Sequence, residues 1–542
     1  MNHTKEAFQQ IDIIKYIKQQ VGSDIWLIAY KKLPYNGGFY CTLIDNSNIS
    51  RAMSNISWDL SIGSGLPSCT RYSCGTEKEQ IKYLRYGEES IQPLVYIRTF
   101  TGIKPNYIEI SEEFRHYHNL YFDSSANKYI KIDNNGDEED IVIIESDNTV
   151  KIKLKAIKQF LAIKEMSLLF LFDCNFYSKK TLDELGIPKT YATTIKEENL
   201  TYSYAYIDVD WGHKNDKSFS NIIGKKLITG YPLEKCGIWP YDEEENEIFD
   251  DFIIGINEYG EEITYTSNPS ELGDYFGKNP NAPHYLTPVF FKREVLNKYY
   301  NEPNKYDVKD GYLSCGGLWG LRLDNNNKNH IMVFLGDLGR DLNHKERLYW
   351  KSFNIAPDGT GISEVCWKRS FEAEFCDPQC PDLKFKYLFQ NFNLSWNEKY
   401  SWDLFLPLNK DDEYHYQTLH IPSNNQSEFD EQVRGLVKII IDSINEKKLD
   451  ELNTEKIDGS INKLEKFLKA NNIANFKVHI DFLRNLQKLR STSIAHRKGS
   501  NYEAIAEIFS LKEKSYIDVF ENILNQAIEL LEFLKMSFLE NS

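Results

Sequence analysis

The sequence predicts a multidomain α+β protein in which a large β-rich N-terminal region is followed by an all-α helical bundle. The chain has 542 residues, and single hydrophobic cores stop growing at about 250–300 residues, so more than one domain is expected. Aromatic residues make up 14% of the chain, and Tyr and Phe fit the half-buried surfaces of strands. Near residue 425 the hydrophobic pattern changes from short alternating runs to the spacing of amphipathic helices.

The region 1–425 reads mainly as strands and turns. Short apolar runs such as QPLVYIRTF, DIVIIES and HIMVFLGDL are separated by turn-forming clusters such as DNNGDEED and DNNNKN, which is the pattern of hairpins. The region is long enough for two subdomains, at about 1–200 and 201–425. Helical spacing interrupts the strands in a few places, and we expect helices at about 4–21, 77–86, 153–167 and 291–300.

The region 426–542 reads as helices throughout. Apolar residues recur on one helical face at Phe429, Val433, Leu436, Ile440 and Ile444. Further helices are expected at about 460–471, 476–490, 502–510 and 513–540. About 115 residues are enough for a helical bundle that folds by itself.

Composition excludes several classes of protein. The longest apolar stretch, Met166 to Phe172, is far below the roughly 20 residues that a membrane span needs. Nine cysteines in the whole chain are too sparse for a disulfide scaffold. A net charge of −16 argues against a surface that binds nucleic acid everywhere. The sequence therefore predicts a cytoplasmic protein with no membrane partner.

The stretch LRSTSIAHRKG at 489–499 is the most informative one for chemistry. It lies on a basic island with no acidic residue between Asp481 and Glu503. Histidine moves protons near neutral pH, and the planar fork of arginine can hold two oxygens of a phosphate. These residue types suit RNA cleavage. Arg490 and His496 are six positions apart, however, and would lie about 120° apart around the axis of one continuous helix, so they could not both reach one phosphate. The cations of the island are Arg484, Lys488, Arg490, Arg497 and Lys498.

The segment RSTSIAH at 490–496, at the end of an expected helix in an all-helical domain, resembles the defining pattern of the HEPN superfamily. That pattern is an arginine, four to six residues, and a histidine, commonly with a polar residue after the arginine, here Ser491. The resemblance implies a metal-independent endoribonuclease without a cofactor, with Arg490 and His496 as catalytic residues. It also implies a homodimer whose two motifs form one site. The RNA-binding residues would be Arg484, Lys488, Ser491, Arg497 and Lys498.

The order of a large β-rich region before a terminal helical domain of this kind is similar to that of the ApeA-like abortive-infection proteins of bacteria. This likeness of architecture implies a role in antiphage defence, with tRNA or other RNA as the target. The N-terminal region would then sense a phage-derived trigger or restrain the nuclease.

Two other interpretations stay open. The helical domain could be a non-catalytic dimeric scaffold in which Arg490 and His496 belong to a solvated basic face. The β-rich region would then recognise a ligand or phage protein, for which the aromatic and acidic strand face of TYSYAYIDVDW at 201–211 is a candidate. Alternatively, Asp208 and Asp210 with His213 could hold a divalent ion in the N-terminal region.

Weaker patterns favour structural roles. His116 and His118 could join such a metal site only if the fold brought them close. Cys376 and Cys380 lack the CxxC spacing of a zinc site. The two glycines of FLGDLGRDL at 334–342 predict a tight turn.

Overall fold

The computed structural model describes residues 4–19, 25–33, 37–54, 66–72, 80–85, 91–209, 215–239, 247–452, 458–493 and 500–540. It divides the chain into two compact units, unit 1 (Met1–Glu245) and unit 2 (Asn246–Ser542). The division lies inside the acidic stretch YDEEENEIFDD at 241–251. None of the helices in these ranges combines the length and the apolarity that a bilayer crossing requires.

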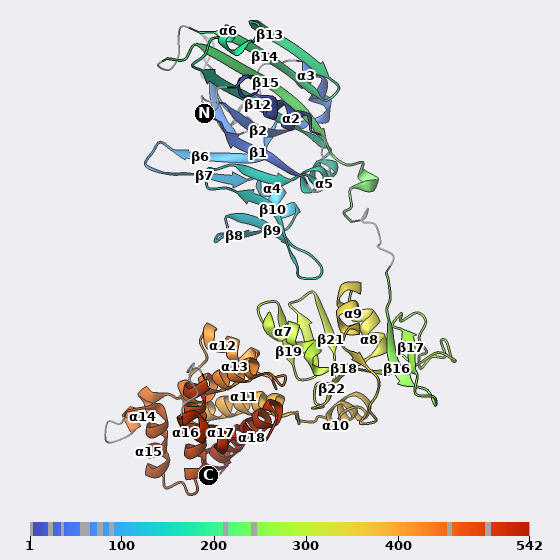
Figure 1. Cartoon of the computed structure of the whole chain (residues 1–542), viewed down its shortest axis with the longest axis vertical. Coiled ribbons are helices and arrows are strands. Elements are labelled where there is room, and N and C mark those ends of the chain that lie inside the picture. Colours follow the sequence, from blue (N-terminus) through green and yellow to red (C-terminus); the bar gives the residue numbers. More distant parts are fainter. Residues whose placement is uncertain are drawn as a thin grey trace. The chain divides into compact units, whose positions relative to one another are not determined.

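Unit 1 is built on one large antiparallel sheet with the strand order β13-β14-β15-β12-β2-β1-β11-β10-β9-β8, and β5 pairs with β2 (Figure 1). Its strands are β1 (Trp26–Lys32), β2 (Gly38–Asp45), β5 (Gln92–Pro93), β8 (Tyr121–Asp123), β9 (Lys128–Ile132), β10 (Glu138–Ile144), β11 (Val150–Lys153), β12 (Met166–Ser178), β13 (Thr190–Glu197), β14 (Leu200–Asp208) and β15 (Ser218–Thr229). The helices of unit 1 are α1 (Lys5–Phe8), α2 (Ile11–Lys18), α3 (Ile49–Ser54), α4 (Glu112–Tyr117), α5 (Leu154–Lys164) and α6 (Leu182–Leu185).

The central strand β12 is buried on both faces, which explains its uninterrupted apolar run. Phe170 and Phe172 belong to the main core of unit 1, whereas Leu169 and Leu171 point into a smaller cluster on the other face. Side chains of α3 cover that smaller cluster. The sheet therefore has a packed layer on each side of its centre.

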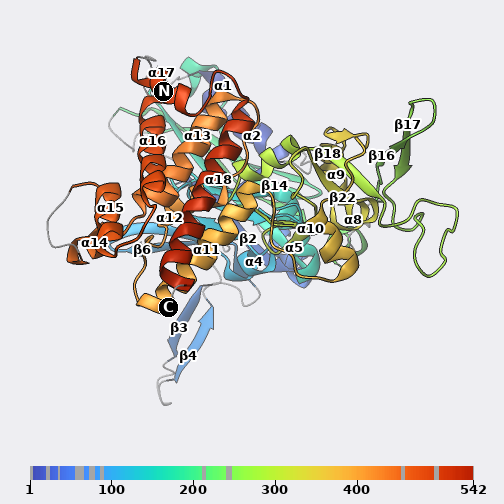
Figure 2. The ribbon, with the colours of Figure 1, turned by 90° about the horizontal axis from the view of Figure 1, so that it is seen from below.

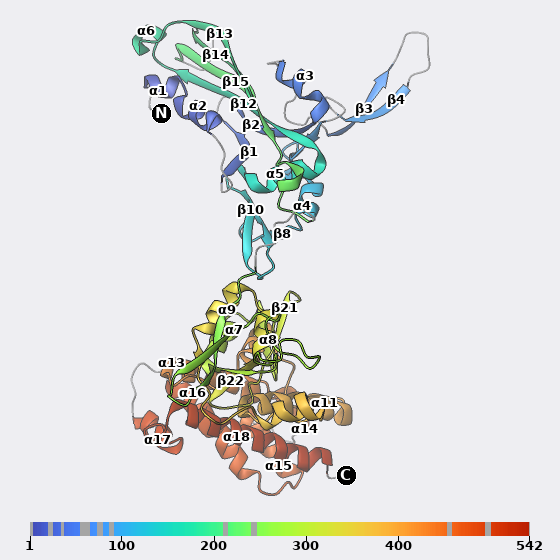
Figure 3. The same cartoon turned by 90° about the vertical axis from the view of Figure 1, so that its right-hand side faces the viewer.

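Two hairpins lie outside this sheet: β3 (Pro67–Tyr72) with β4 (Gln80–Arg85), and β6 (Val95–Phe100) with β7 (Lys104–Ile110). The first hairpin projects from the sheet (Figure 3). Its second strand occupies part of the range 77–86, so the helix predicted there is wrong. Ile81 and Tyr83 are both more than 70% exposed, and pairing with β3 rather than burial determines the local structure.

The first part of unit 2, which we call the α/β part (residues 247–376), contains small sheets and short helices. Its strands are β16 (Asp251–Ile256), β17 (Glu262–Thr266), β18 (Pro288–Lys292), β19 (Tyr306–Lys309), β20 (Tyr312–Cys315), β21 (Trp319–Arg322), β22 (His330–Phe334) and β23 (Asn354–Ile355). Its helices are α7 (Asn297–Asn301), α8 (Leu335–Asp341), α9 (His344–Lys351), α10 (Glu364–Trp367) and the π-turn η4 (Lys368–Glu372).

The glycines of FLGDLGRDL lie in a helix and not in the predicted turn. A Cβ atom on Gly336 would lie 2.2 Å from the ring of Tyr285, and one on Gly339 would lie 1.8 Å from the carbonyl oxygen of Ser267. Helix α8 therefore needs glycine at both positions because neighbouring groups approach its backbone closely.

The second part of unit 2 is a helical bundle, and four of its long helices, α11, α13, α16 and α18, run alongside one another (Figure 2). Its elements are α11 (Pro381–Tyr400), α12 (Lys410–Gln417), α13 (Gln426–Val437), the π-turn η5 (Lys438–Asp442), α14 (Glu446–Leu452), α15 (Ser460–Ala470), α16 (Lys477–Ser493), α17 (Ser500–Ile508), α18 (Tyr516–Lys535) and the π-turn η6 (Met536–Glu540).

The bundle begins before the expected boundary at residue 426. Phe385, Phe389, Phe392 and Trp396 of α11 belong to the same buried cluster as the apolar side chains of α13, α16 and α18. These aromatic residues follow one another at intervals of four, three and four, which is helical spacing. The β-rich character of the chain accordingly ends near β22, and most of residues 335–417 that lie in regular structure are helical.

A buried polar joint connects the α/β part to the bundle. Asp382 of α11 is 1% exposed and accepts a hydrogen bond from the backbone of Ile421 at 3.2 Å. The guanidinium of Arg293 lies 3.7 Å from the same carboxylate. Beside this pair, the rings of Tyr300 and His420 stack at 4.1 Å between centroids with an interplanar angle of 2°. The two parts therefore pack through paired polar groups as well as apolar ones.

Replacing Phe392 by alanine should destabilise unit 2 by about 3–5 kcal/mol, because the change leaves a cavity in the core that α11 shares with the rest of the bundle. Leu394→Ala, on the same helix at 64% exposure, is the matched control and should change stability by less than about 0.5 kcal/mol. The protection of α18 peptides against hydrogen exchange measures the change in stability of each variant. Unchanged protection of α18 in Phe392→Ala would show that α11 is not part of this core.

Candidate functional site

The predicted catalytic segment begins in the last described turn of α16. Ile480, Leu483, Leu486 and Leu489 of this helix are buried in the bundle. Their spacing leaves Arg490 at the edge of the buried face, with its side chain 24% exposed. Helix α16 is described as far as Ser493, and His496, Arg497 and Lys498 lie outside the described residues.

The guanidinium of Arg490 is held by a carboxylate from another part of the bundle. Its Nη1 atom donates a hydrogen bond to Oδ2 of Asp442 at 2.8 Å, and Asp442 lies at the end of η5. Lys438 Nζ lies 3.4 Å from the same oxygen. This arrangement orients Arg490 and partly neutralises its charge.

The structure places the other described residues of the predicted RNA-binding set as follows. Arg484 is paired with Glu465 at 2.6 Å and donates a hydrogen bond to Asn462 at 2.9 Å. The Ser491 hydroxyl donates to the backbone carbonyl of Gln487 at 2.8 Å, within its own helix. Lys488 is exposed. Two arginines of the basic island thus have acidic partners supplied by the fold.

These acidic partners could not be inferred from the sequence of the island. Glu465 lies on α15 and Asp442 on the turn after α13, 19 and 48 residues from the arginines that they pair with. Only the packing of α13, α15 and α16 brings them to the basic residues. The island is therefore less positive in the folded protein than along the chain.

The alternative sites in the N-terminal region do not assemble from the described residues. Asp208 accepts a hydrogen bond from the backbone of Leu182 at the start of α6, at 2.9 Å, while Asp210 and His213 lie outside the described ranges. Within those ranges, no group of three or more His, Cys, Asp and Glu side chains could hold a metal ion.

His116 and His118 are separated by the fold. His116 is exposed and lies 3.6 Å from Glu112, one turn away on α4. His118 is 5% exposed, and its Nε2 atom hydrogen-bonds to the carbonyl oxygen of Ala156 at 2.9 Å. Burial lowers the pKa of His118 to about 4. His118 is thus a neutral core residue near pH 7.

The aromatic face of β14 is part of the core and not an exposed binding surface. Tyr202 and Tyr206 are 5% and 7% exposed. Tyr202 packs in the main core of unit 1, and the Tyr206 ring lies 5.9 Å from that of Phe8. The predicted alternation along the strand is therefore present, but its tyrosine face points inward.

Lys386 is a chemically distinctive residue that was not singled out from the sequence. It lines a cavity of about 750 Å³ between β19 and the helices α11 and α12. Burial lowers the pKa of Lys386 to about 8, and its Nζ atom donates to the carbonyl oxygen of Gln417 at 3.0 Å. Lys386 lies in a run of alternating aromatic and basic residues, and this sequence pattern does not predict that its side chain is half-buried beside a cavity.

Comparison of the chain with protein-family models, with curated proteins and with solved structures gave no match. The function is therefore inferred from the residues and from the geometry of the fold.

Acidification should destabilise unit 1 through His118. Because the folded pKa is about 4 and the unfolded value is about 6.5, the unfolded state binds more protons between these values. The contribution of His118 to the free energy of unfolding of unit 1 should therefore be fully present above about pH 6.5. It should fall as the pH decreases toward 4, by on the order of 3 kcal/mol. Calorimetric unfolding at pH 7 and pH 5 measures the loss.

His118→Gln should reduce this pH dependence, since glutamine can still donate to Ala156 but does not titrate. His116→Gln, at an exposed position two residues away, is the matched control and should leave the pH dependence intact. An identical loss on acidification in wild-type protein and His118→Gln would contradict the assignment.

Proposed function

We propose that the chain is a metal-independent endoribonuclease of the HEPN type that acts in bacterial antiphage defence, with the N-terminal region as sensor or restraint. The observation that carries the proposal is the position of Arg490. The residue lies on the bundle helix α16, partly exposed and oriented by Asp442, and it opens the segment RSTSIAH.

Helix geometry restricts how Arg490 and His496 can act together. Arg490 and His496 would point about 120° apart on one continuous helix, which would prevent them from acting on one phosphate. A break in the helix between the two residues, or a His496 contributed by a second copy of the chain, would remove this restriction.

Each residue has a defined task in the proposed reaction. The 2′-hydroxyl of the RNA attacks the adjacent phosphorus, and the bond to the 5′-oxygen breaks, which leaves a 2′,3′-cyclic phosphate. His496 transfers the proton that this exchange requires. Arg490 binds the phosphate oxygens as negative charge develops on them. Lys488, Arg497 and Lys498 would bind phosphates on either side of the cleaved bond.

The proposed active form is a homodimer in which the two motifs form one groove, as the resemblance implies. The RNA is tRNA or another cellular RNA, and a phage-derived component bound by the N-terminal region is the proposed trigger.

A non-catalytic dimeric binding protein is the alternative, and one observation favours it. Arg484 and Arg490 are each paired with a carboxylate, at 2.6 and 2.8 Å, as expected for arginines that stabilise the fold. The two functions differ in whether RNA is cleaved.

Purified protein incubated with total RNA in EDTA should leave fragments with 2′,3′-cyclic phosphate ends, and DNA should stay intact because it lacks the attacking hydroxyl. His496→Ala and Arg490→Ala should each lower the cleavage rate by about 10²–10⁴-fold, the usual contribution of a proton-transfer or charge-stabilising group. Co-expression of the protein with candidate phage proteins supplies the proposed trigger of cleavage.

Arg434→Ala is the matched control for Arg490→Ala. Arg434 is a partly exposed arginine of α13 that is paired with Glu431 at 2.7 Å, so its loss removes a similar ion pair without touching the motif. Cleavage that persists in His496→Ala, or that EDTA abolishes, would refute the mechanism. A strict monomer during cleavage would refute the composite site.

A further inference from the structure

The α/β part of unit 2 contains a cavity of about 650 Å³ that none of the predicted sites uses. It lies among β21, β22, α8, α10 and η4, and its volume is typical of a site for a small molecule. Both acidic and basic side chains line it, together with aromatic ones. They include Tyr285, Tyr312, Arg322, Asp337 and Arg369.

Asp337 of α8 is a buried carboxylate with one oxygen still available. Its side chain is 7% exposed, and its Oδ1 atom accepts a hydrogen bond from the Tyr285 hydroxyl at 2.8 Å. Arg340 Nη2 lies 2.9 Å from the same oxygen. Oδ2 accepts no hydrogen bond from the part of the chain that the structure describes. Burial raises the pKa of this carboxyl above its ordinary value, so a donor from a ligand would offset the cost of burying the group.

Arg322 is the cation that is available to a ligand. Arg340 binds Asp341 through two hydrogen bonds of 2.7 Å, and Arg369 is paired with Asp310 at 2.7 Å. Arg322 is exposed at the end of β21 and forms no ion pair with the described residues. An anionic group of a ligand would complete its environment, because arginine binds phosphate with two N–H groups at once.

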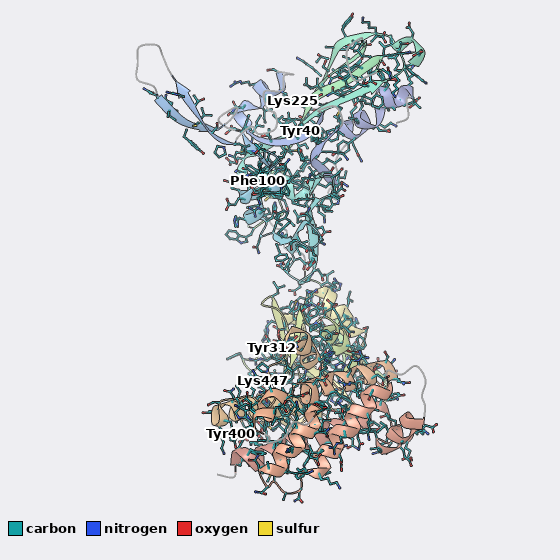
Figure 4. All side chains as sticks on the ribbon, turned by 90° about the vertical axis from the view of Figure 1, so that its left-hand side faces the viewer. Tyr40, Phe100, Lys225, Tyr312, Tyr400 and Lys447 are labelled. Carbon is teal, nitrogen blue, oxygen red and sulfur yellow. The ribbon has the colours of Figure 1, made fainter. Side chains whose placement is uncertain are left out.

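Aromatic side chains complete the lining. The Tyr285 ring is fixed against the backbone of α8, where only Gly336 leaves room for it. Tyr312 is 43% exposed and is labelled in Figure 4. An exposed ring at the edge of a polar cavity offers a stacking surface for a planar heterocycle.

We propose that this cavity binds a nucleoside monophosphate, with a hydroxyl or amino group of the nucleoside donating to Asp337 Oδ2, the base against Tyr312 and the phosphate on Arg322. The cavity is of suitable volume, and each contact uses a residue that lines it. The site is separate from Arg490 and does not depend on the proposed nuclease activity.

Titration calorimetry of the full-length protein with AMP, GMP, CMP and UMP, each beside its nucleoside and beside inorganic phosphate, tests the proposal. At least one monophosphate should bind, about tenfold or more tightly than its nucleoside, because only the monophosphate reaches Arg322. Arg322→Gln should reduce its affinity to that of the nucleoside. Asp337→Asn should weaken monophosphate and nucleoside alike by at least about tenfold.

Controls separate this site from other effects. Asp307→Asn changes a partly exposed carboxylate that is paired with Lys309 and lies outside the lining, and it should leave binding unchanged. Arg490→Ala should also leave binding unchanged, which distinguishes this cavity from the proposed RNA site. Arg322 is exposed, so Arg322→Gln tests the proposal even if Asp337→Asn fails to fold.

The proposal is overturned if none of the four monophosphates binds at millimolar concentration, if phosphate alone binds as tightly, or if Arg322→Gln binds like wild type.

Discussion

The buried carboxylate of Asp382 is the group on which the organisation of unit 2 depends. It lies at the start of α11, where the α/β part meets the bundle, with Arg293 on one side and the backbone of Ile421 on the other. The Arg293 guanidinium also donates to the carbonyl oxygens of Asn325 and Asn327. A buried charge is tolerated only where such partners surround it. The joint therefore constrains how the strands of the α/β part can sit on the helices of the bundle.

The same joint links the segment RSTSIAH to the α/β part. Arg490 does not belong to an isolated terminal domain, because α16 shares its core with α11 and α11 carries Asp382. The cavity beside Asp337 lies in the same compact unit. A ligand that stabilised the α/β part could thus influence the bundle through the joint, provided that its affinity differs between two states of unit 2.

Much of the bundle could be predicted from the sequence, because its apolar spacing reflects the burial of each helix. The helices expected at 460–471 and 476–490 correspond to α15 and α16. The boundary was misplaced because α11 is rich in Phe, Tyr and Trp, which favour strands, although their spacing is helical. The strand β4 was missed because its pairing partner, β3, is a tertiary feature that local spacing does not reveal.

The candidate site was predictable only in part. The residue types of RSTSIAH indicate phosphate and proton chemistry, but the carboxylates that pair with Arg484 and Arg490 come from other elements of the bundle, α15 and η5. The burial of His118 and of the tyrosine face of β14 depends on which side of the sheet is covered, and alternation alone does not specify that side. The cavity beside Asp337 gathers residues from several elements between Tyr285 and Ser370, and their spacing in the sequence follows no motif.

Native-state hydrogen exchange of the full chain carrying Asp382→Asn tests most directly whether unit 2 is one body. The substitution removes the carboxylate that lies 3.7 Å from the half-buried Arg293, and breaking a buried pair costs at most about 3–5 kcal/mol. Protection should therefore fall together in β18 and β22 of the α/β part and in α11 and α13 of the bundle. If α13, α16 and α18 kept the protection of the wild-type protein while only the α/β part and α11 opened, the bundle would be an independent domain, and the account of unit 2 as one body would be contradicted.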